Sequence, residues 1–252
     1  MEYIKDGERL DEVNDSLSLI QKTDGLTFGT DALLLASFIN CRAKSGIELG
    51  SGSGIISLLL LTRGKLADAT ALEVQEEYRD LTERNAMLNA LDDRLTAICT
   101  DAREYKTDKS FDLVYTNPPY MKVDSGRANE LTKKNIARHE VFGTIGDFCA
   151  TAARLLKFGG TFAVVYRTDR LIDLIAAMRD SRLEAKRMTF VHADAESRPS
   201  MVLVEGKLGA KPSLDLTAPL IIYKDKKHKE YTDDMNYIME NGSFPERFYK
   251  TR

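Results

Sequence analysis

The sequence predicts an α/β fold whose doubly wound, mostly parallel sheet ends in an antiparallel hairpin. Three observations carry this prediction. Short apolar runs alternate with helical patterns through the middle of the chain, which is typical of βαβ units. A glycine-rich turn at residues 50–54 joins one such run to the next helix. Two later runs, 183–191 and 201–207, follow each other without a helix between them, which indicates a hairpin.

The first half of the predicted sheet contains three strands and two helices. A strand ends at residues 47–49, and an apolar helix follows over residues 55–61. A second strand covers residues 69–73 and leads into a charged, amphipathic helix over residues 76–89. Residues 95–99 then form the third strand of this half.

The second half begins with a strand at residues 111–115. We expect a helix over residues 147–157, capped by Gly159 and Gly160, because glycine commonly ends helices. A strand over residues 161–166 follows. Leucine, isoleucine and methionine at positions i, i+3, i+4 and i+7 of the segment 171–178 predict an amphipathic helix that faces the sheet.

Composition excludes several classes of protein. Of the 252 residues, 36 are Lys or Arg and 39 are Asp or Glu, so the net charge of −3 gives no sign of nucleic-acid binding by the chain as a whole. A hydrophobic content of 43% excludes a disordered chain. The apolar runs are too short for a membrane span, and the three separated cysteines indicate a reduced, cytoplasmic location without a metal site. We expect a monomer.

We predict a single domain with an extension at each end. Residues 1–44 are expected to form an N-terminal extension, residues 45–208 the alternating α/β domain, and residues 209–252 a C-terminal extension. The two extensions lack the alternation of strands and helices that marks the region between them.

The glycine turn predicts a ligand site. Backbone N–H groups at a turn before a helix favour an anionic or polar ligand. A dinucleotide fingerprint would need glycine where Ile55 stands, and the Gly-Lys-Ser/Thr of a P-loop is missing. The run Glu48–Gly54 instead resembles motif I of the class I methyltransferases, in which the turn faces the methionine part of S-adenosyl-L-methionine. The resemblance implies a Rossmann-like, seven-stranded methyltransferase domain whose cofactor site includes the residues Glu48, Gly50, Gly52 and Gly54.

Two acidic residues stand at the ends of the next strands. Glu73 ends the second strand, where a carboxylate can accept hydrogen bonds from both ribose hydroxyls. Asp101 follows the third strand and is placed to accept from the adenine amino group. The alternative for each is a solvated carboxylate without a ligand. Their order after the glycine turn favours cofactor binding.

The Asn-Pro-Pro-Tyr stretch 117–120 is the predicted catalytic elbow, and Asn117 is also a predicted cofactor-binding residue. The prolines end the preceding strand, and ligands of open α/β sheets converge at such strand ends. The Asn117 side-chain oxygen and the Pro118 carbonyl can accept from both N–H groups of a planar amine, while Pro119 stiffens the elbow. Tyr120 offers a face for a flipped or single-stranded base. The alternative is a purely structural turn.

This order of motifs resembles the methyltransferases that modify adenine N6, glutamine N5 or guanine N2. The segment 25–35 is similar to the opening signature of the bacterial valine-tRNA adenine-N6 methyltransferases, which act on the adenine immediately 3′ of the anticodon. That resemblance implies that Thr30 and Asp31 border the cofactor pocket. The alternative, which the residue types fit equally well, is that Thr30 or Asp31 caps the following helix.

Basic residues gather in two places. The predicted substrate-binding cluster follows the elbow and consists of Lys122, Arg127, Lys133, Lys134 and Arg138. A second cluster consists of Lys224, Lys226, Lys227 and Lys229. Both are placed to neutralise RNA phosphates, and the alternative is a solvated loop. For His139 we expect structural packing or RNA contact rather than catalysis.

Together these observations predict transfer of a methyl group from S-adenosyl-L-methionine to adenine N6 in RNA, with the anticodon loop of a valine tRNA as the expected partner. Three alternatives remain open. They are glutamine-N5 methylation of a release factor, guanine-N2 methylation of rRNA or N6 methylation of adenine in DNA, and a non-catalytic RNA-binding module that binds the cofactor.

Overall fold

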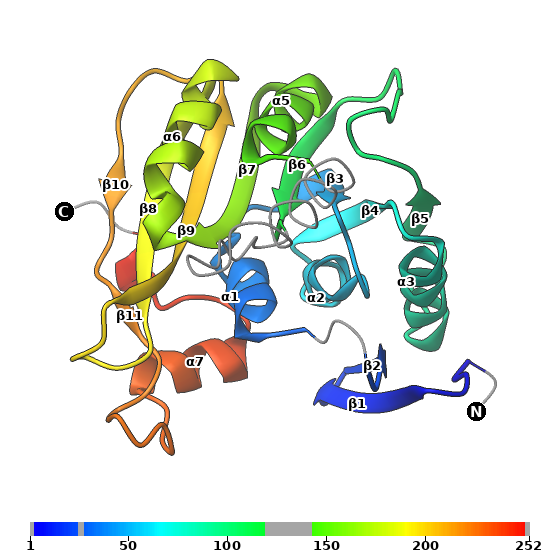
Figure 1. Cartoon of the computed structure of the whole chain (residues 1–252), viewed down its shortest axis with the longest axis horizontal. Helices are drawn as coiled ribbons and strands as arrows, with labels where there is room; N and C mark the ends of the chain where they lie inside the picture. The colour runs from blue at the N-terminus through cyan, green and yellow to red at the C-terminus, as the bar shows by residue number, and fades with distance from the viewer. Residues whose placement is uncertain (1–2, 25–27, 119–142, 250–252) are drawn as a thin grey trace, which may run out of the picture.

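The computed structural model describes residues 3–24, 28–118 and 143–249 (Figure 1). Within these residues a nine-stranded sheet forms the centre of the molecule, in the order β10-β8-β9-β7-β6-β3-β4-β5 with β11 also beside β8. The seven predicted strands are present as β3 (Ala43–Leu49), β4 (Leu66–Glu73), β5 (Leu95–Cys99), β6 (Phe111–Thr116), β7 (Leu156–Arg167), β8 (Leu183–His192) and β9 (Pro199–Leu208).

The count of seven strands was too low. β10 (Asp215–Leu216) and β11 (Leu220–Ile221) add two short strands along the outer edge of β8, both parallel to it. Each is only two residues long, so neither produces the periodic pattern by which a strand is predicted from sequence.

The strands from β5 across to β7 are all parallel to their neighbours, whereas β9 runs antiparallel to both β7 and β8. β8 therefore runs in the same direction as β7. Every strand of the sheet except β9 consequently ends at one side, which we call the carboxyl edge. The predicted hairpin at the end of the sheet is confirmed.

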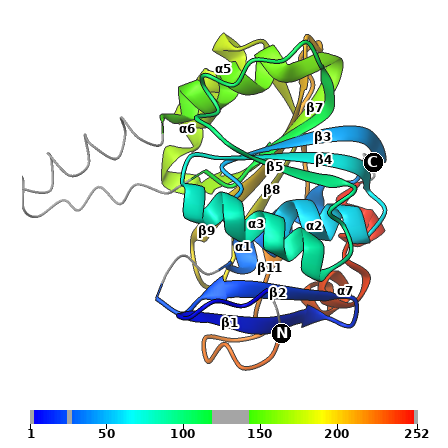
Figure 2. The same ribbon diagram turned by 90° about the vertical axis from the view of Figure 1, so that its right-hand side faces the viewer.

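Helices cover both faces of the sheet (Figure 2). Along β6, Leu113 and Tyr115 belong to one buried cluster and Val114 to the other, as the alternation of a strand requires. One face carries α5 (Ile145–Leu155) and α6 (Leu171–Asp180), and the other carries α1 (Thr30–Phe38), α2 (Ile55–Thr62), α3 (Glu76–Leu88) and α7 (Asp233–Asn241).

The N-terminal segment forms a separate two-stranded hairpin, β1 (Glu8–Asn14) and β2 (Leu17–Lys22). Asn85 of α3 is fully buried and binds both backbone groups of Ile20, accepting from its N–H at 2.7 Å and donating to its carbonyl at 3.1 Å. The same amide donates to the Ser53 carbonyl at 3.0 Å. One side chain therefore connects the hairpin, α3 and the glycine turn.

The C-terminal segment packs into the same core as the sheet. Phe244 contacts Phe38 of α1 edge-on, with ring centroids 5.5 Å apart, and Phe248 contacts Phe244 at 5.2 Å. Phe248 belongs to the 3₁₀ turn η2 (Glu246–Phe248) and is fully buried. The guanidinium of Arg187 lies 3.8 Å from the Phe38 ring centroid and 4.5 Å from that of Tyr249.

The predicted glycine cap of the helix at residues 147–157 was wrong. α5 begins after a capping box formed by Thr144 and Asp147, and β7 begins at Leu156, directly after the helix. Gly159 and Gly160 lie inside β7, where the register moves from Phe111↔Leu156 to Leu113↔Thr161. A Cβ on Gly160 would approach the Lys157 carbonyl to 2.8 Å. The glycines lie within this register shift of the strand and not at a helix end.

No helix within the described ranges is long and apolar enough to cross a membrane. The same residues contain no group of three or more His, Cys, Asp or Glu side chains arranged to hold a metal ion.

Candidate active site

The order of the strands reverses at β3, because the chain continues to β4 on one side and reaches β6 on the other. Open α/β sheets bind ligands in the crevice at such a reversal. Thr116 at the end of β6 is fully buried and donates its hydroxyl to the Leu49 carbonyl at the end of β3, at 2.7 Å. The next residues along the two strands are Asn117 and Gly50. The glycine turn and the elbow therefore start side by side.

Three glycines give the turn its shape. Gly50, Gly52 and Gly54 have φ values of +74°, +55° and +78°, a region that other residues rarely adopt. A Cβ on Gly54 would lie 2.7 Å from Cγ2 of Thr82, whose hydroxyl donates to the Gly52 carbonyl at 2.9 Å. At Gly52 the same added atom would meet nothing within 4 Å. The glycine turn therefore leaves an open space beside it that backbone atoms line.

Glu73 lies directly against this turn. Its side chain is buried, with one oxygen accepting from the Gly52 N–H at 2.9 Å and the other from the Gln75 N–H at 3.0 Å. A carboxylate oxygen has a second lone pair, so both oxygens keep the capacity to accept from a further donor. The two hydrogen bonds hold the Glu73 carboxylate in one orientation. Its predicted contact with the ribose hydroxyls stays a prediction.

Asp101, after β5, is paired with a residue that the sequence analysis missed. Arg103 donates from its backbone N–H at 2.8 Å and from Nη2 at 2.5 Å to the Asp101 carboxylate. These hydrogen bonds keep the pKa of Asp101 below its ordinary value. The group is therefore an ionised acceptor, as its predicted role at adenine requires. The only signal in the sequence is a basic residue two positions after the acid.

Glu48 makes its hydrogen bonds inside the protein. It is 1% exposed and accepts from the Ser57 hydroxyl at 2.5 Å and from the Ser57 N–H at 3.2 Å. The Ser57 oxygen lies 2.7 Å from the Tyr115 hydroxyl oxygen. Burial raises the pKa of Glu48 to about 8. Its predicted contact with the cofactor stays a prediction.

The alternative of a helix cap at Thr30 or Asp31 was wrong, because the N-cap of α1 is Gly29 and no side chain caps the helix. Asp31 binds the elbow instead. Its Oδ2 accepts from Nδ2 of Asn117 at 2.9 Å, and its Oδ1 accepts from the Ala32 N–H at 2.9 Å. Asp31 and Asn117 are 86 residues apart in the chain. Thr30 is exposed beside them.

The contact with Asp31 orients the Asn117 amide. An ionised carboxylate only accepts hydrogen bonds, so the amide must turn its NH₂ group toward Asp31. Its oxygen, Oδ1, is then free to accept from another donor. This orientation could not be predicted from the sequence, since it depends on the fold bringing α1 to the end of β6.

Several predicted residues lie outside the described part of the chain. They are Pro119, Tyr120, Lys122, Arg127, Lys133, Lys134, Arg138 and His139. Pro118 is buried at the end of the described elbow. The second basic cluster lies on an exposed loop after β11.

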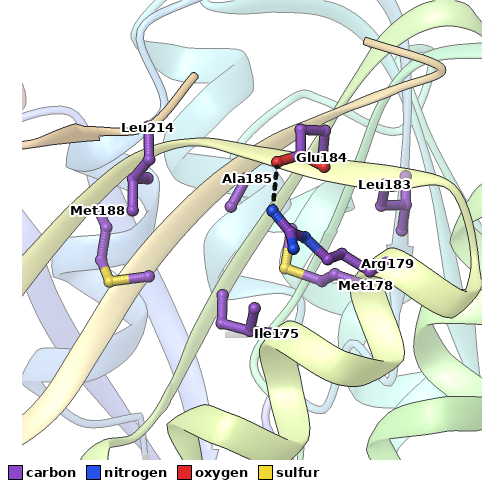
Figure 3. Close-up of a pocket in the computed structure, with 8 residues that line it drawn as sticks. All are labelled: Ile175, Met178, Arg179, Leu183, Glu184, Ala185, Met188 and Leu214. Atoms are coloured by element: carbon purple, nitrogen blue, oxygen red, sulfur yellow. Dashed lines mark hydrogen bonds and ion pairs between the residues drawn. The ribbon is translucent and has the colours of Figure 1, made fainter. Parts of the chain in front are cut away.

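A cavity of about 110 Å³ lies elsewhere in the molecule, between α6, β8 and Leu214 (Figure 3). Its lining includes Met178 and Leu183, near the end of α6 and the start of β8, and the ion pair between Arg179 and Glu184 at 3.2 Å. β8 runs from this cavity toward the carboxyl edge, so the cavity and the elbow occupy different places in the fold.

Comparison with known proteins identifies related sequences. Residues 22–187 match the family model of the methyltransferase small domain. A protein of Phocaeicola vulgatus named tRNA1(Val) (adenine(37)-N6)-methyltransferase is 29% identical over 195 residues, covering 76% of this chain and 82% of that protein. A protein of Bacteroides thetaiotaomicron with the same name is 30% identical over 179 residues, covering 70% of this chain and 74% of that protein.

Solved structures share the fold. A predicted O-methyltransferase from Agrobacterium tumefaciens matches with a TM-score of 0.69 and 23% identity, over 85% of this chain and 98% of that chain. Together, the matches in sequence and structure confirm the resemblance predicted from the motifs and the Rossmann-like class I methyltransferase fold.

Proposed function

Because the chain belongs to the methyltransferase small domain family and is an enzyme that uses S-adenosyl-L-methionine, we propose that it methylates adenine N6 in a tRNA. The adenine immediately 3′ of the anticodon of a valine tRNA is the proposed target. The names of the curated relatives support this choice, at identities of 29% and 30%. A tRNA substrate also supports the cytoplasmic location expected from the cysteines.

The observation that carries the proposal is the orientation of Asn117. The lone pair of an aromatic amine is delocalised into the ring, so the nitrogen is a poor nucleophile. Asn117 Oδ1, left free by the contact of Nδ2 with Asp31, accepts from one N–H, and the Pro118 carbonyl accepts from the other. These two hydrogen bonds favour a pyramidal nitrogen whose lone pair points in one fixed direction. The residues therefore contribute to catalysis by positioning the nucleophile.

The cofactor supplies an electrophilic methyl group on a sulfonium sulfur. Gly50 and Gly52 provide the open backbone turn beside the methionine part of the cofactor. Glu73 accepts hydrogen bonds from the ribose hydroxyls, and Asp101 accepts one from the adenine amino group. With the cofactor bound, the amine nitrogen would form the new N–C bond as the C–S bond broke, and the methylated nitrogen would then lose one proton to water. No general base is needed, because the positively charged nitrogen that methylation produces on an aromatic amine is strongly acidic.

Tyr120 and the predicted substrate-binding cluster complete the proposed site. Tyr120 stacks on the target base, and the cluster neutralises phosphates that flank it.

The test is methylation of separate substrate pools. The protein is incubated with tritiated cofactor and with tRNA, rRNA, DNA or release-factor protein, and label is counted in each pool. We expect label in tRNA, recovered as N6-methyladenosine after nuclease digestion. An anticodon stem-loop with purine in place of the target adenine serves as the control, because it lacks the amino group.

Label confined to release factor would replace the proposal with glutamine-N5 methylation, and label in rRNA or DNA would replace it with the corresponding base methylation. Cofactor binding without transfer to any pool would favour a non-catalytic binding module.

A further inference from the structure

The loop that follows β11 carries a column of three stacked rings. The Tyr223 ring lies between His228 and Tyr231, with centroid distances of 4.6 Å and 5.2 Å and interplanar angles of 19° and 24°. A backbone bridge pairs Tyr223 with Tyr231 and closes the loop. His228 forms the outer end of the column, and 43% of its side chain is exposed. The outer ring is therefore partly open to solvent.

The turn between β8 and β9 holds this outer ring in place. Asp194 is buried and accepts from the backbone N–H groups of Glu196 and Ser197, each at 3.0 Å, and from the Ser197 hydroxyl at 2.6 Å. These bonds, together with His228 Nε2 at 3.1 Å, lower the pKa of Asp194 to about 2. The ionised carboxylate thus fixes the orientation of the His228 ring.

Lysines outnumber acidic residues in the loop that carries the column, although Lys224 pairs with Glu230 at 3.4 Å. The lysines of the second basic cluster are all exposed, and Arg198 is exposed on the neighbouring turn. Lys226 pairs with Glu196 at 2.7 Å, whereas Lys227 and Lys229 form no ion pair with any residue that the structure describes. Cations around an exposed ring suit a ligand that carries both phosphates and bases.

The loop stands beyond the same edge of the sheet as Asn117. β11 runs parallel to β8, and Ile221 pairs with His192 at the end of β8. From β6 the neighbouring strands are β7, β9, β8 and then β11. Four spacings of about 4.8 Å give a lateral separation of about 19 Å, which equals the rise of five or six stacked nucleotides at about 3.4 Å each. Figure 1 shows this loop in orange at the lower left, below β8 and β9.

We propose that residues 223–231, together with Arg198, form a second RNA contact, in which the lysines bind phosphates and the outer face of His228 stacks on an unpaired base. This inference rests on the proposed function, since it assigns one surface of the same tRNA complex. An acidic polypeptide is the competing ligand, and it has no base to stack.

Two loop variants and a matched control test the inference. The loop variant combines Lys226→Ala, Lys227→Ala and Lys229→Ala, and a second variant is His228→Ala. The control removes the same charge from exposed lysines at the opposite edge by combining Lys44→Ala, Lys207→Ala and Lys211→Ala. The dissociation constant of a fluorescently labelled, unmethylated tRNA is measured for the full-length proteins at several salt concentrations.

We expect the loop variant to bind tRNA about tenfold more weakly than wild type and to lower the slope of log K against log salt by about 2, since each lost phosphate contact removes ~0.7–0.9. His228→Ala should weaken binding about fivefold to tenfold without changing that slope. The control should stay within about twofold. The melting temperatures of the lysine variants should match wild type, because the substituted side chains are exposed. The melting temperature of His228→Ala is measured as well, because this variant also removes the contacts with Tyr223 and Asp194.

If the wild-type protein methylates tRNA and the loop variant binds it as well as the control, the second contact is wrong while the proposed function stands. A wild-type protein that neither binds nor methylates tRNA would overturn both. If polyglutamate binds as tightly as tRNA and His228→Ala affects neither, the surface recognises acidic polypeptide and the RNA assignment fails.

Discussion

At the scale of single residues, a substitution of Asn117 tests methyl transfer separately from cofactor binding. Asn117→Ala removes the proposed acceptor for the target amine but leaves the glycine turn, Glu73 and Asp101 untouched. We expect kcat for methyl transfer to fall about 10²–10³-fold, the range for loss of one positioned polar group. The dissociation constant of the cofactor, measured by calorimetry, should change less than about threefold. Unchanged transfer would remove Asn117 from the mechanism.

Asp31 is the positioning residue for that amide. Asp31→Asn keeps the size of the side chain but adds a donor, so the Asn117 amide is no longer forced into one orientation. We expect kcat to fall about 10-fold to 50-fold with the KM for the cofactor nearly unchanged. Single-turnover assays at saturating cofactor measure this directly. A matching rise in the cofactor KM with kcat intact would place Asp31 at the cofactor instead.

At the scale of elements, Asn85 joins α3 to β2 and to the glycine turn. Asn85→Ala leaves the N–H and carbonyl of Ile20 without their side-chain partner in a buried place, and each unsatisfied group costs about 1–3 kcal/mol. We expect the free energy of unfolding to fall by about 3 kcal/mol and protease cleavage in the N-terminal hairpin to become faster. Asn241→Ala is the control, because that amide is exposed and makes one local bond. Equal stability of the two variants would contradict this account.

Some helices and strands of this chain were predicted accurately from the sequence, and one feature was misread. β5 and α2 were predicted to within one residue, because each is a short apolar run that is bounded on both sides by polar or glycine residues. The register shift at Gly159 was misread as a helix end, since glycine is common at irregular positions of strands as well as after helices. The bond between Asp31 and Asn117 was not predicted at all. It depends on three-dimensional proximity, whereas the glycine turn and its acids follow one another in order along the chain.

At the scale of the whole molecule, Glu48 couples stability to pH. Burial raises its pKa from 4.5 to about 8, so between these values the folded protein keeps a proton that the unfolded chain releases. The free energy of unfolding therefore decreases as pH rises through this window. Between pH 5.5 and 8.5, wild type should lose about 2–4 kcal/mol more than Glu48→Gln. Urea denaturation at both pH values provides the measurement, and parallel losses would contradict the assignment.

The C-terminal extension contributes to global stability through Phe248. Phe248→Ala would open a cavity beside Phe244 in the core, and such truncations cost about 3–5 kcal/mol. Phe158→Ala is the matched control, because that ring is 79% exposed. Thermal unfolding should show a large decrease in melting temperature for the first variant and almost none for the second. Similar melting temperatures would mean that the extension is energetically independent of the sheet.

The reversal of strand order at β3 also has a consequence for folding. Residues 43–99 form β3, β4 and β5, and residues 111–221 contain the other described strands of the sheet. Three residue pairs form the ladder between β3 and β6 that joins the two halves. The crevice lies on this seam, with Gly50 contributed by one half and Asn117 by the other. If the proposed site is correct, neither half alone contains all of it. A chain in which the two halves have not joined should therefore be inactive, and methyl transfer would report that they have joined.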